Sequence, residues 1–243
     1  MQMQREAMIE VQDLAFAWPQ QAPLLQIPQL TIAASERVFL KGPSGSGKST
    51  LLGLLGGVNL PSCGQIKLLG QDLTQLSAAQ RDQFRADHCG FIFQQFNLLP
   101  FLTVLQNVVL GCQFSKIRQQ KARQRFGSVL AAAEQLLIQL GLANALHEQP
   151  ASSLSIGQQQ RVAVARGLIG APELLIADEP TSALDSDTRV LFLELLFKES
   201  QASQTSVLFV SHDQSLASQF DRQLDLLQLN QAPWVQQLAE GAR

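Results

Sequence analysis

The nine residues from 42 to 50, Gly-Pro-Ser-Gly-Ser-Gly-Lys-Ser-Thr, constrain the fold more than any other stretch of the chain. They follow the apolar run 38–40 and precede leucines at positions 51, 52, 54 and 55, which have helical spacing. A strand, a glycine-rich turn and a helix in this order hold a phosphate group with backbone N–H groups and the positive end of the helix. A flexible Gly/Ser linker is the alternative, but a linker would not be flanked by two core-forming runs.

Each residue type in this loop has an expected role. Gly42, Gly45 and Gly47 are expected to take positive φ angles, so that successive N–H groups point inward. Lys48 is expected to reach the β- and γ-phosphates, and Ser49 is expected to offer its hydroxyl to Mg²⁺. The predicted nucleotide-binding residues of the loop are Gly42, Pro43, Ser44, Gly45, Ser46, Gly47, Lys48, Ser49 and Thr50.

Composition limits the class of protein. The chain has 243 residues, 46% of them hydrophobic, which suits one large α/β domain or two small ones. A net charge of -2 gives no sign of a nucleic-acid partner. The three cysteines, Cys63, Cys89 and Cys112, lack any paired spacing and are expected to be free thiols in a reducing cytoplasm. The first twelve residues contain Arg5 but no apolar run, so we expect no secretory signal.

The most apolar stretch, residues 91–110, does not fit a transmembrane helix. Polar residues such as Gln94 interrupt it, and Pro100 lies in its middle. We expect a buried strand at 90–93, a loop, and a helix that starts near Thr103. Some apolar side chains of this loop should be exposed and form a groove for a partner; the candidates are Phe96, Leu98, Leu99 and Phe101.

A second cluster of chemical groups follows the hydrophobic run 174–177, which ends in Asp178 and Glu179. At the carboxyl end of a parallel strand, these side chains would emerge into the ligand crevice of the sheet. Asp178 would then hold Mg²⁺, and Glu179 would polarise a water for attack on the γ-phosphorus. The alternative is that Asp178, Glu179 and Pro180 only form the turn that ends this strand. His212 follows another buried run, 207–210, and is either a plain polar strand end or a contact of the γ-phosphate.

Two further features are open to two interpretations each. Ser155 and Gln158 satisfy a capping box, so the helix that they begin is either simply well capped or also an anion site formed with the Gly157 amide. Because the chain already holds phosphates at residues 42–49, a second anion site would meet the γ-phosphate bound to another copy, which predicts a dimer. Trp18 is either a half-buried packing residue or a platform for an adenine ring.

The order and spacing of these motifs resemble the ATP-binding cassette (ABC) transporter ATPases over nearly the whole chain. The resemblance implies an α/β fold, with a P-loop NTPase core, a mixed sheet and an inserted α-helical subdomain. It implies one ABC ATPase domain over 1–243, with the core at about 1–94 and 172–230, the helical subdomain at about 95–171 and a tail at 231–243.

The resemblance also assigns roles to residues. Lys48, Glu179 and His212 become catalytic, with Glu179 the base and His212 the switch histidine. The Mg²⁺ ligands become Ser49, Gln94 and Asp178, where Gln94 is the Q-loop glutamine that also senses the permease. The nucleotide contacts outside residues 42–50 become Trp18 at the usual place of an adenine-stacking tyrosine, Gln94, the signature residues Ser155, Gly157 and Gln158, and Asp185 of the D-loop 182–185.

The runs at 91–94, 97–100 and 103–108 resemble the lipoprotein-release and macrolide-efflux class of the family. That class implies two copies that dimerise head to tail on ATP and drive a separate inner-membrane permease, as a peripheral homodimer on its cytoplasmic face without nucleic acid. Ile156 departs from the family's signature, which has a glycine there, and should be helical or extended. The alternatives are a P-loop kinase, or an ATP-dependent regulatory or scaffolding switch of a membrane complex of cell-division type.

Overall fold

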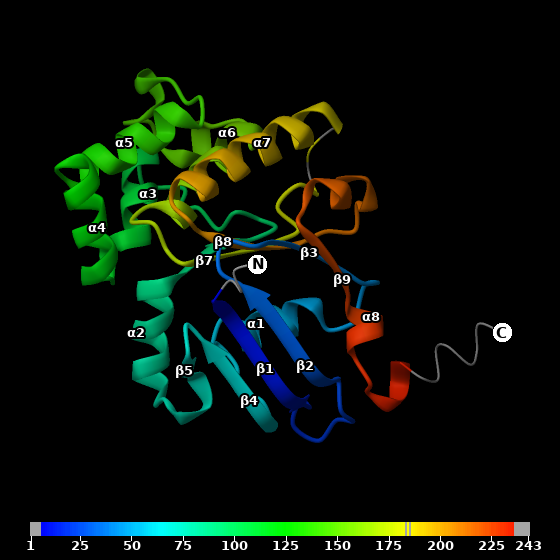
Figure 1. Cartoon of the computed structure of the whole chain (residues 1–243). Coiled ribbons are helices and arrows are strands. Elements are labelled where there is room, and N and C mark those ends of the chain that lie inside the picture. Colours follow the sequence, from blue (N-terminus) through cyan, green and yellow to red (C-terminus); the bar gives the residue numbers. More distant parts are fainter. Residues whose placement is uncertain (1–5, 183, 185, 236–243) are drawn as a thin grey trace, which may run out of the picture. The chain divides into compact units, whose positions relative to one another are not determined.

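The computed structural model describes residues 6–182, 184 and 186–235, and the chain divides into two compact units (Figure 1). Unit 1 contains the residues up to Asp82 and those from Leu208 onward, and unit 2 contains Gln83–Val207. The predicted division into a core and a helical subdomain at residues 94/95 and 171/172 stays a prediction.

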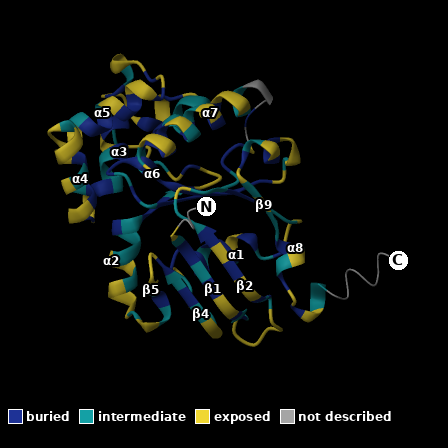
Figure 2. Cartoon of the chain, in the orientation of Figure 1, coloured by how far each residue is buried: buried dark blue, intermediate teal, exposed yellow. Residues whose placement is uncertain are grey.

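Unit 1 contains a four-stranded antiparallel sheet with the order β2-β1-β4-β5. Its strands are β1 (Ala7–Phe16), β2 (Leu25–Ala33), β4 (Cys63–Leu68) and β5 (Gln71–Asp72). Val11 of β1 lies opposite Leu30 on one side and Ile66 on the other, and all three are buried. Buried and more exposed residues alternate along β1 and β2 (Figure 2), as expected of a sheet with one face in the core.

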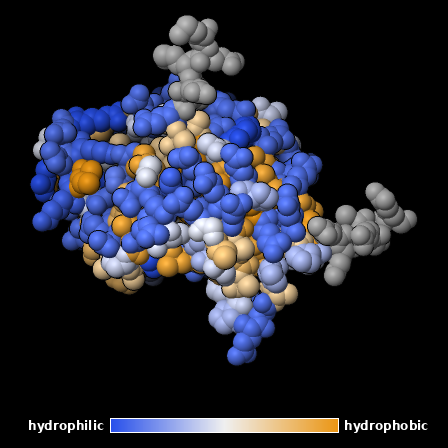
Figure 3. Space-filling view, turned by 60° about the horizontal axis from the view of Figure 1, so that its bottom comes forward, coloured by the Kyte–Doolittle hydropathy of each residue, from blue (hydrophilic) through white to orange (hydrophobic). Residues whose placement is uncertain are grey.

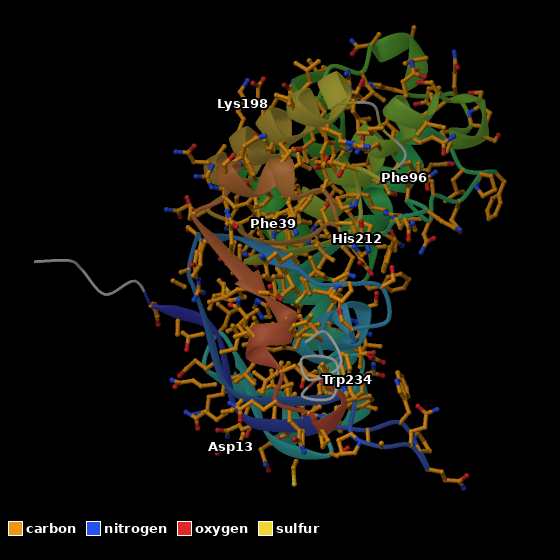
Figure 4. The ribbon with its side chains drawn as sticks, turned by 90° about the vertical axis from the view of Figure 1, so that its right-hand side faces the viewer. Asp13, Phe39, Phe96, Lys198, His212 and Trp234 are labelled. Atoms are coloured by element: carbon orange, nitrogen blue, oxygen red, sulfur yellow. The ribbon has the colours of Figure 1, made fainter. Side chains whose placement is uncertain are left out.

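Unit 1 also contains a parallel pair of strands, β3 (Arg37–Lys41) and β9 (Arg222–Asp225). The strand β8 (Ser206–Val210) is buried along its whole length and continues from unit 2 into unit 1. Phe39 of β3, labelled in Figure 4, packs its ring 6.3 Å from that of Phe209 and 5.3 Å from that of Phe220. The helices α1 (Lys48–Leu55) and α8 (Leu226–Leu229) complete the regular structure after β3 and β9.

Unit 2 pairs β6 (Cys89–Ile92) with β7 (Leu174–Asp178) in parallel and surrounds them with helices. The helices are α2 (Ala78–His88), which begins in unit 1, α3 (Val104–Gln113), α4 (Lys116–Phe126), α5 (Val129–Gln139), α6 (Ile156–Leu168) and α7 (Ser186–Ala202). Short 3₁₀ helices lie at Leu73–Gln75, Asn144–Leu146, Ala151–Ser153 and Gln214–Gln219. Parallel and antiparallel strands with helices confirm the predicted α/β class with mixed sheets.

The helix predicted near Thr103 is confirmed, because Thr103 caps α3 with a complete capping box. None of the helices within the described ranges is long and apolar enough to cross a membrane. All three cysteines are free, and burial raises the pKa of the Cys89 thiol to about 12.

The region from Ser115 to Leu142, first basic and then apolar, forms two helices. Gly127 takes a φ of 83° and ends α4, and Ser128 caps α5. The basic helix α4 is partly buried. Arg118 is only 3% exposed and donates hydrogen bonds to the carbonyls of Cys89, Gly167 and Ile169 at 2.6–3.1 Å. Its five N–H donors can satisfy several backbone acceptors at once, which explains why an arginine is buried here.

Glu173 forms ion pairs with two residues of unit 2. Its carboxylate accepts hydrogen bonds from Lys121 Nζ at 2.6 Å and His88 Nδ1 at 3.0 Å. Burial alone would raise the pKa of Glu173, but the hydrogen bonds and charges of His88 and Lys121 outweigh it and lower the pKa from 4.5 to about 2.

The free energy of unfolding should therefore depend on Glu173 at neutral pH and lose that contribution in acid. A lowered carboxyl pKa stabilises the fold above its unfolded value, 4.5, and the stabilisation disappears as the pH falls toward 2. We expect Glu173→Gln to cost about 2 kcal/mol at pH 7 and roughly a quarter of that at pH 2.5, which lies just above the folded pKa. Urea unfolding across this pH range measures the difference, with Glu148→Gln at an exposed site as the control. An equal cost at both pH values would contradict the assignment.

Candidate functional site

The glycine-rich loop lies where the sequence predicted it, between the end of β3 and the start of α1. Gly45 takes a φ of 79° and Gly47, the N-cap of α1, takes a φ of 95°, as predicted. The same prediction was wrong for Gly42, which does not take a positive φ. Gly42 is needed for space instead, because a Cβ there would lie 2.8 Å from Ser46 Oγ and 3.3 Å from Leu226 Cβ.

The Lys48 ammonium group is held above the loop. Lys48 Nζ donates hydrogen bonds to the carbonyls of Gly42 at 2.9 Å and Pro43 at 3.0 Å. The same atom lies 3.3 Å from His212 Nε2, although the two residues are 164 positions apart in the sequence. An ammonium group only donates, so the Nε2 of His212 is assigned as the acceptor of this contact. The structure therefore brings two of the predicted catalytic residues together in unit 1, where Figure 4 labels His212.

The loop fits a phosphate group and its cation. Ser46 is 1% exposed, and its hydroxyl has no hydrogen-bond partner among the described residues. An unsatisfied buried hydroxyl costs free energy, so a ligand that pairs with it would be favoured. A Cβ at Gly45 would meet nothing within 4 Å, and Ser49 is exposed, so this side of the loop is accessible.

An open cavity of about 400 Å³ lies beside the loop in unit 1. It is lined by Lys41, Gly42, Pro43, Ser211, His212, Gln214, Asp225 and Leu227. Lys41 Nζ lies 3.4 Å from a carboxylate oxygen of Asp225, so this ion pair joins the ends of β3 and β9 at the cavity. The carboxyl ends of parallel strands are the usual place for a ligand in an α/β sheet.

Trp18 lies in the hairpin that connects β1 to β2, also in unit 1. Its ring is 41% exposed and packs its edge against Phe16, with the ring centroids 5.0 Å apart. The next residues of the hairpin lead to Leu24 and Leu25, which contact Gly47 of the glycine-rich loop: a Cβ at Gly47 would lie 3.0 Å from Leu25 and 3.4 Å from Leu24. Trp18 is therefore partly packed, with the rest of its surface accessible, on a hairpin that touches the loop.

The predicted carboxylates lie in unit 2. Asp178 ends β7, and Glu179 follows it with a φ of 50°, which is unusual for a residue other than glycine. The turn after Glu179 is held by Gln160 of α6, which is 1% exposed and donates from Nε2 to the carbonyl of Pro180 at 2.7 Å. His212 belongs to unit 1.

The loop after β6 carries Gln94, which is exposed. Phe96 and Asn97 both take positive φ values, 57° and 49°, and Arg166 of α6 donates hydrogen bonds to both of their carbonyls. Phe96, one of the four candidates for an exposed apolar residue, is only 6% exposed.

The other apolar residues of this loop are more accessible. Phe101 is 76% exposed, Leu99 is 38% exposed, and Leu98 is half-buried. The face drawn in Figure 3 is mainly hydrophilic, with its apolar groups separated by polar ones.

The signature stretch begins α6 with its capping box complete. Gln158 N donates to Ser155 Oγ at 3.3 Å, and Ser155 N donates to Gln158 Oε1 at 2.9 Å. Ile156 is the first helical residue and is 54% exposed, which confirms the helical alternative for this position. A Cβ at Gly157 would meet nothing within 4 Å. The N-terminal end of α6 is therefore accessible at Ile156 and Gly157. Asp185 of the predicted D-loop lies outside the described residues.

Unit 1 thus carries the loop 42–50, Trp18 and His212, and unit 2 carries Gln94, the signature and the two carboxylates. Among the described residues, no three His, Cys, Asp or Glu side chains gather closely enough to hold a metal ion. Sequence reasoning missed Gln160 and Arg166, because their roles depend on burial and on contacts with distant segments.

Comparisons with known proteins agree with this geometry. The ABC transporter family profile matches residues 25–182. The chain is 40% identical to the lipoprotein-releasing system ATP-binding protein LolD of Pseudomonas fluorescens over 227 residues, 92% of this chain and 96% of that protein. It is 41% identical to the macrolide export ATP-binding/permease protein MacB of Chromobacterium violaceum, covering 81% of this chain and 29% of that longer protein.

Solved structures give the same result. The dimeric post-hydrolysis state of the ATP-binding cassette MJ0796 bound to ADP and Pi matches with a TM-score of 0.77 and 33% identity, over 90% of this chain and 94% of that chain. These relatives support the transporter-subunit interpretation and not the regulatory-switch alternative. The chain belongs to the ABC transporter family and is an ATP-binding, ATP-hydrolysing subunit of that family.

Proposed function

We propose that two copies of this chain form a head-to-tail dimer on ATP and drive a separate inner-membrane permease from its cytoplasmic face. The observation that carries the proposal is the Lys48 ammonium group, which the loop carbonyls hold within 3.3 Å of His212. A mobile cation with a histidine beside it, at the start of a helix, is suited to a triphosphate. The predicted single domain, with its core at about 1–94 and 172–230 and its helical subdomain at about 95–171, is part of this proposal.

The glycine-rich loop binds the phosphates. The N–H groups at the start of α1 accept negative charge, and Lys48 exchanges its carbonyl partners for β- and γ-phosphate oxygens. The buried Ser46 hydroxyl gains a partner in the same step. Trp18 stacks on the adenine ring with its accessible surface.

Mg²⁺, when bound, neutralises charge on the β- and γ-phosphates, and Ser49, Gln94 and Asp178 would hold it. Glu179 takes the proton of the attacking water, and its unusual backbone conformation is held in place by the turn that Gln160 anchors. His212 has an acceptor at Nε2 in this structure and would need a proton there to hold a γ-phosphate oxygen.

The second copy completes each site. The N-terminus of α6 is capped and open at Gly157, so Ser155, Gly157 and Gln158 of one copy meet the γ-phosphate held by the other. Asp185 of the D-loop is proposed as a further nucleotide contact. The similarity to a dimeric cassette structure supports this arrangement.

Leu99 and Phe101 are the proposed contact with the permease, because they are exposed and apolar in the loop that carries Gln94. An apolar surface of this kind accepts a short partner helix through a few anchor residues. The substrate class is proposed from the relatives, whose names describe lipoprotein release and macrolide export. No nucleic-acid partner is proposed.

Replacing Lys48 tests the phosphate loop. We expect Lys48→Ala to weaken ATP binding by about 10- to 100-fold, because charge-assisted hydrogen bonds to the phosphates are lost. Calorimetric titration with ATP and Mg²⁺ measures the change, and Lys116→Ala, at an exposed lysine of α4, is the control. Equal affinity of the Lys48 variant and the wild type would remove the phosphate-loop assignment.

Replacing Glu179 tests the proposed base and the dimer together. Glu179→Gln keeps the shape of the side chain and loses the base, so hydrolysis should slow by at least about 100-fold while ATP binding persists. Light scattering with ATP and Mg²⁺ should then show a stable dimer, and Glu194→Gln should behave as the wild type. A Glu179 variant that hydrolyses ATP at the normal rate would rule out the assigned base.

Replacing the exposed apolar residues tests the permease contact. Leu99→Ser with Phe101→Ser should leave basal ATPase activity nearly unchanged, because neither residue belongs to the nucleotide site. It should abolish copurification with an inner-membrane permease and the stimulation of ATPase activity by it. Leu130→Ser, at a residue of α5 that is 52% exposed, is the control. Intact stimulation in the double variant would place the contact elsewhere.

A further inference from the structure

Residues 230–234 run beside the nucleotide-binding hairpin of unit 1, far from it in the sequence. Figure 4 shows Trp234 in the part of the molecule where these residues pass β1 and β2, and the Gln231 N–H donates to the carbonyl of Gln26 at 2.7 Å. We propose that Asn230 and Trp234 are positioning residues for nucleotide binding. The inference rests on the proposed nucleotide site and adds residues to it that touch no nucleotide.

Asn230 and Trp234 both contact the hairpin at the carbonyl group of Leu24. The oxygen of Leu24 accepts one hydrogen bond from Asn230 Nδ2 at 2.9 Å and another from Trp234 Nε1 at 2.9 Å. The Asn230 side chain also accepts from Gln26 N at 2.8 Å and from Ala232 N at 3.1 Å. Asn230 is only 3% exposed and uses both ends of its amide, so its side chain fixes the backbone on both sides of Leu25.

Leu24 and Leu25 connect this hydrogen-bonded segment to the phosphate loop. A Cβ at Gly47 would lie 3.0 Å from Leu25 Cδ2 and 3.4 Å from Leu24 Cγ, so these two side chains pack directly over Gly47. Gly47 takes a φ of 95° and is the N-cap of α1, immediately before Lys48. A shift of Leu24 and Leu25 would therefore release the backbone from which the phosphate-binding N–H groups project.

The same segment holds the hairpin that carries Trp18. Leu24 N donates to the carbonyl of Phe16 at 2.8 Å and closes the hairpin, and Gln21 N donates to the carbonyl of Trp18 at 3.0 Å. Residues 19–23 between these bonds are exposed. The position of Trp18 thus depends on the closure at Leu24, which Asn230 and Trp234 stabilise from outside. A displacement of Leu24 would therefore weaken the contacts to both the base and the phosphates of a bound nucleotide.

The test removes one donor and keeps the aromatic ring. Trp234→Phe deletes the Nε1–H, and the loss of one neutral hydrogen bond should raise the KM for ATP by about three- to tenfold. The kcat should stay within about twofold, because no group that takes part in the chemistry is altered. Amide hydrogen exchange of residues 17–25 should speed up in the nucleotide-free variant. Gln231→Ala is the matched control, since its exposed side chain is removed while its backbone bond to Gln26 remains.

An unchanged KM in Trp234→Phe would overturn the inference. A fall in kcat at unchanged KM would overturn it as well, because that result indicates a smaller folded fraction and no role in binding. Failure of the underlying nucleotide site is distinguishable, since Lys48→Ala would then bind ATP as tightly as the wild type. If Lys48→Ala weakens ATP binding and Trp234→Phe has a normal KM, the nucleotide site stands and only the positioning role is refuted. The two tryptophans of the chain also mean that Trp234→Phe leaves Trp18 as the single fluorophore, so its emission reports on the hairpin directly.

Discussion

The phosphate loop depends on a contact between the Lys48 ammonium group and backbone carbonyls that precede it by five and six residues. This contact keeps the only cation of the loop directed at the place where phosphate oxygens would lie. It is possible because Gly42 leaves room for Ser46 and because Gly45 and Gly47 turn the backbone through positive φ. A Cβ at Gly42 would lie 2.8 Å from Ser46 Oγ, and a Cβ at Gly47 would lie 3.0 Å from Leu25. The loop can therefore take this conformation because neither position carries a side chain.

The loop is supported by segments that are distant in the sequence. Leu24 and Leu25 pack over Gly47, and Asn230 and Trp234 hold the carbonyl of Leu24. His212 reaches Lys48 from the end of β8. The nucleotide site of unit 1 is therefore an assembly of hydrogen bonds across some 200 positions, and its precision depends on the whole unit being folded.

In unit 2, the helix α6 contributes residues to three parts of the candidate site. The N-terminus of α6 presents the signature residues, Gln160 anchors the turn after Glu179, and Arg166 binds the carbonyls of the loop that follows Gln94. A helix moves as a stiff body, so a displacement at its N-terminus would be felt by both the catalytic turn and the loop that carries Leu99 and Phe101. This arrangement would link the proposed dimer contact to the proposed permease contact within unit 2.

The local motifs could be predicted from the sequence because their chemistry is local. The loop 42–50, the capping box at Ser155 and Gln158 and the strand that ends at Asp178 each need only a few consecutive residues to define hydrogen-bond donors and backbone angles. The tertiary structure alone showed that Arg118 and Phe96 are buried, that Gly42 supplies space, and that Asn230 and Trp234 reach Leu24. Burial and long-range hydrogen bonds depend on which segments meet in space, and periodicity along the chain carries no information about that.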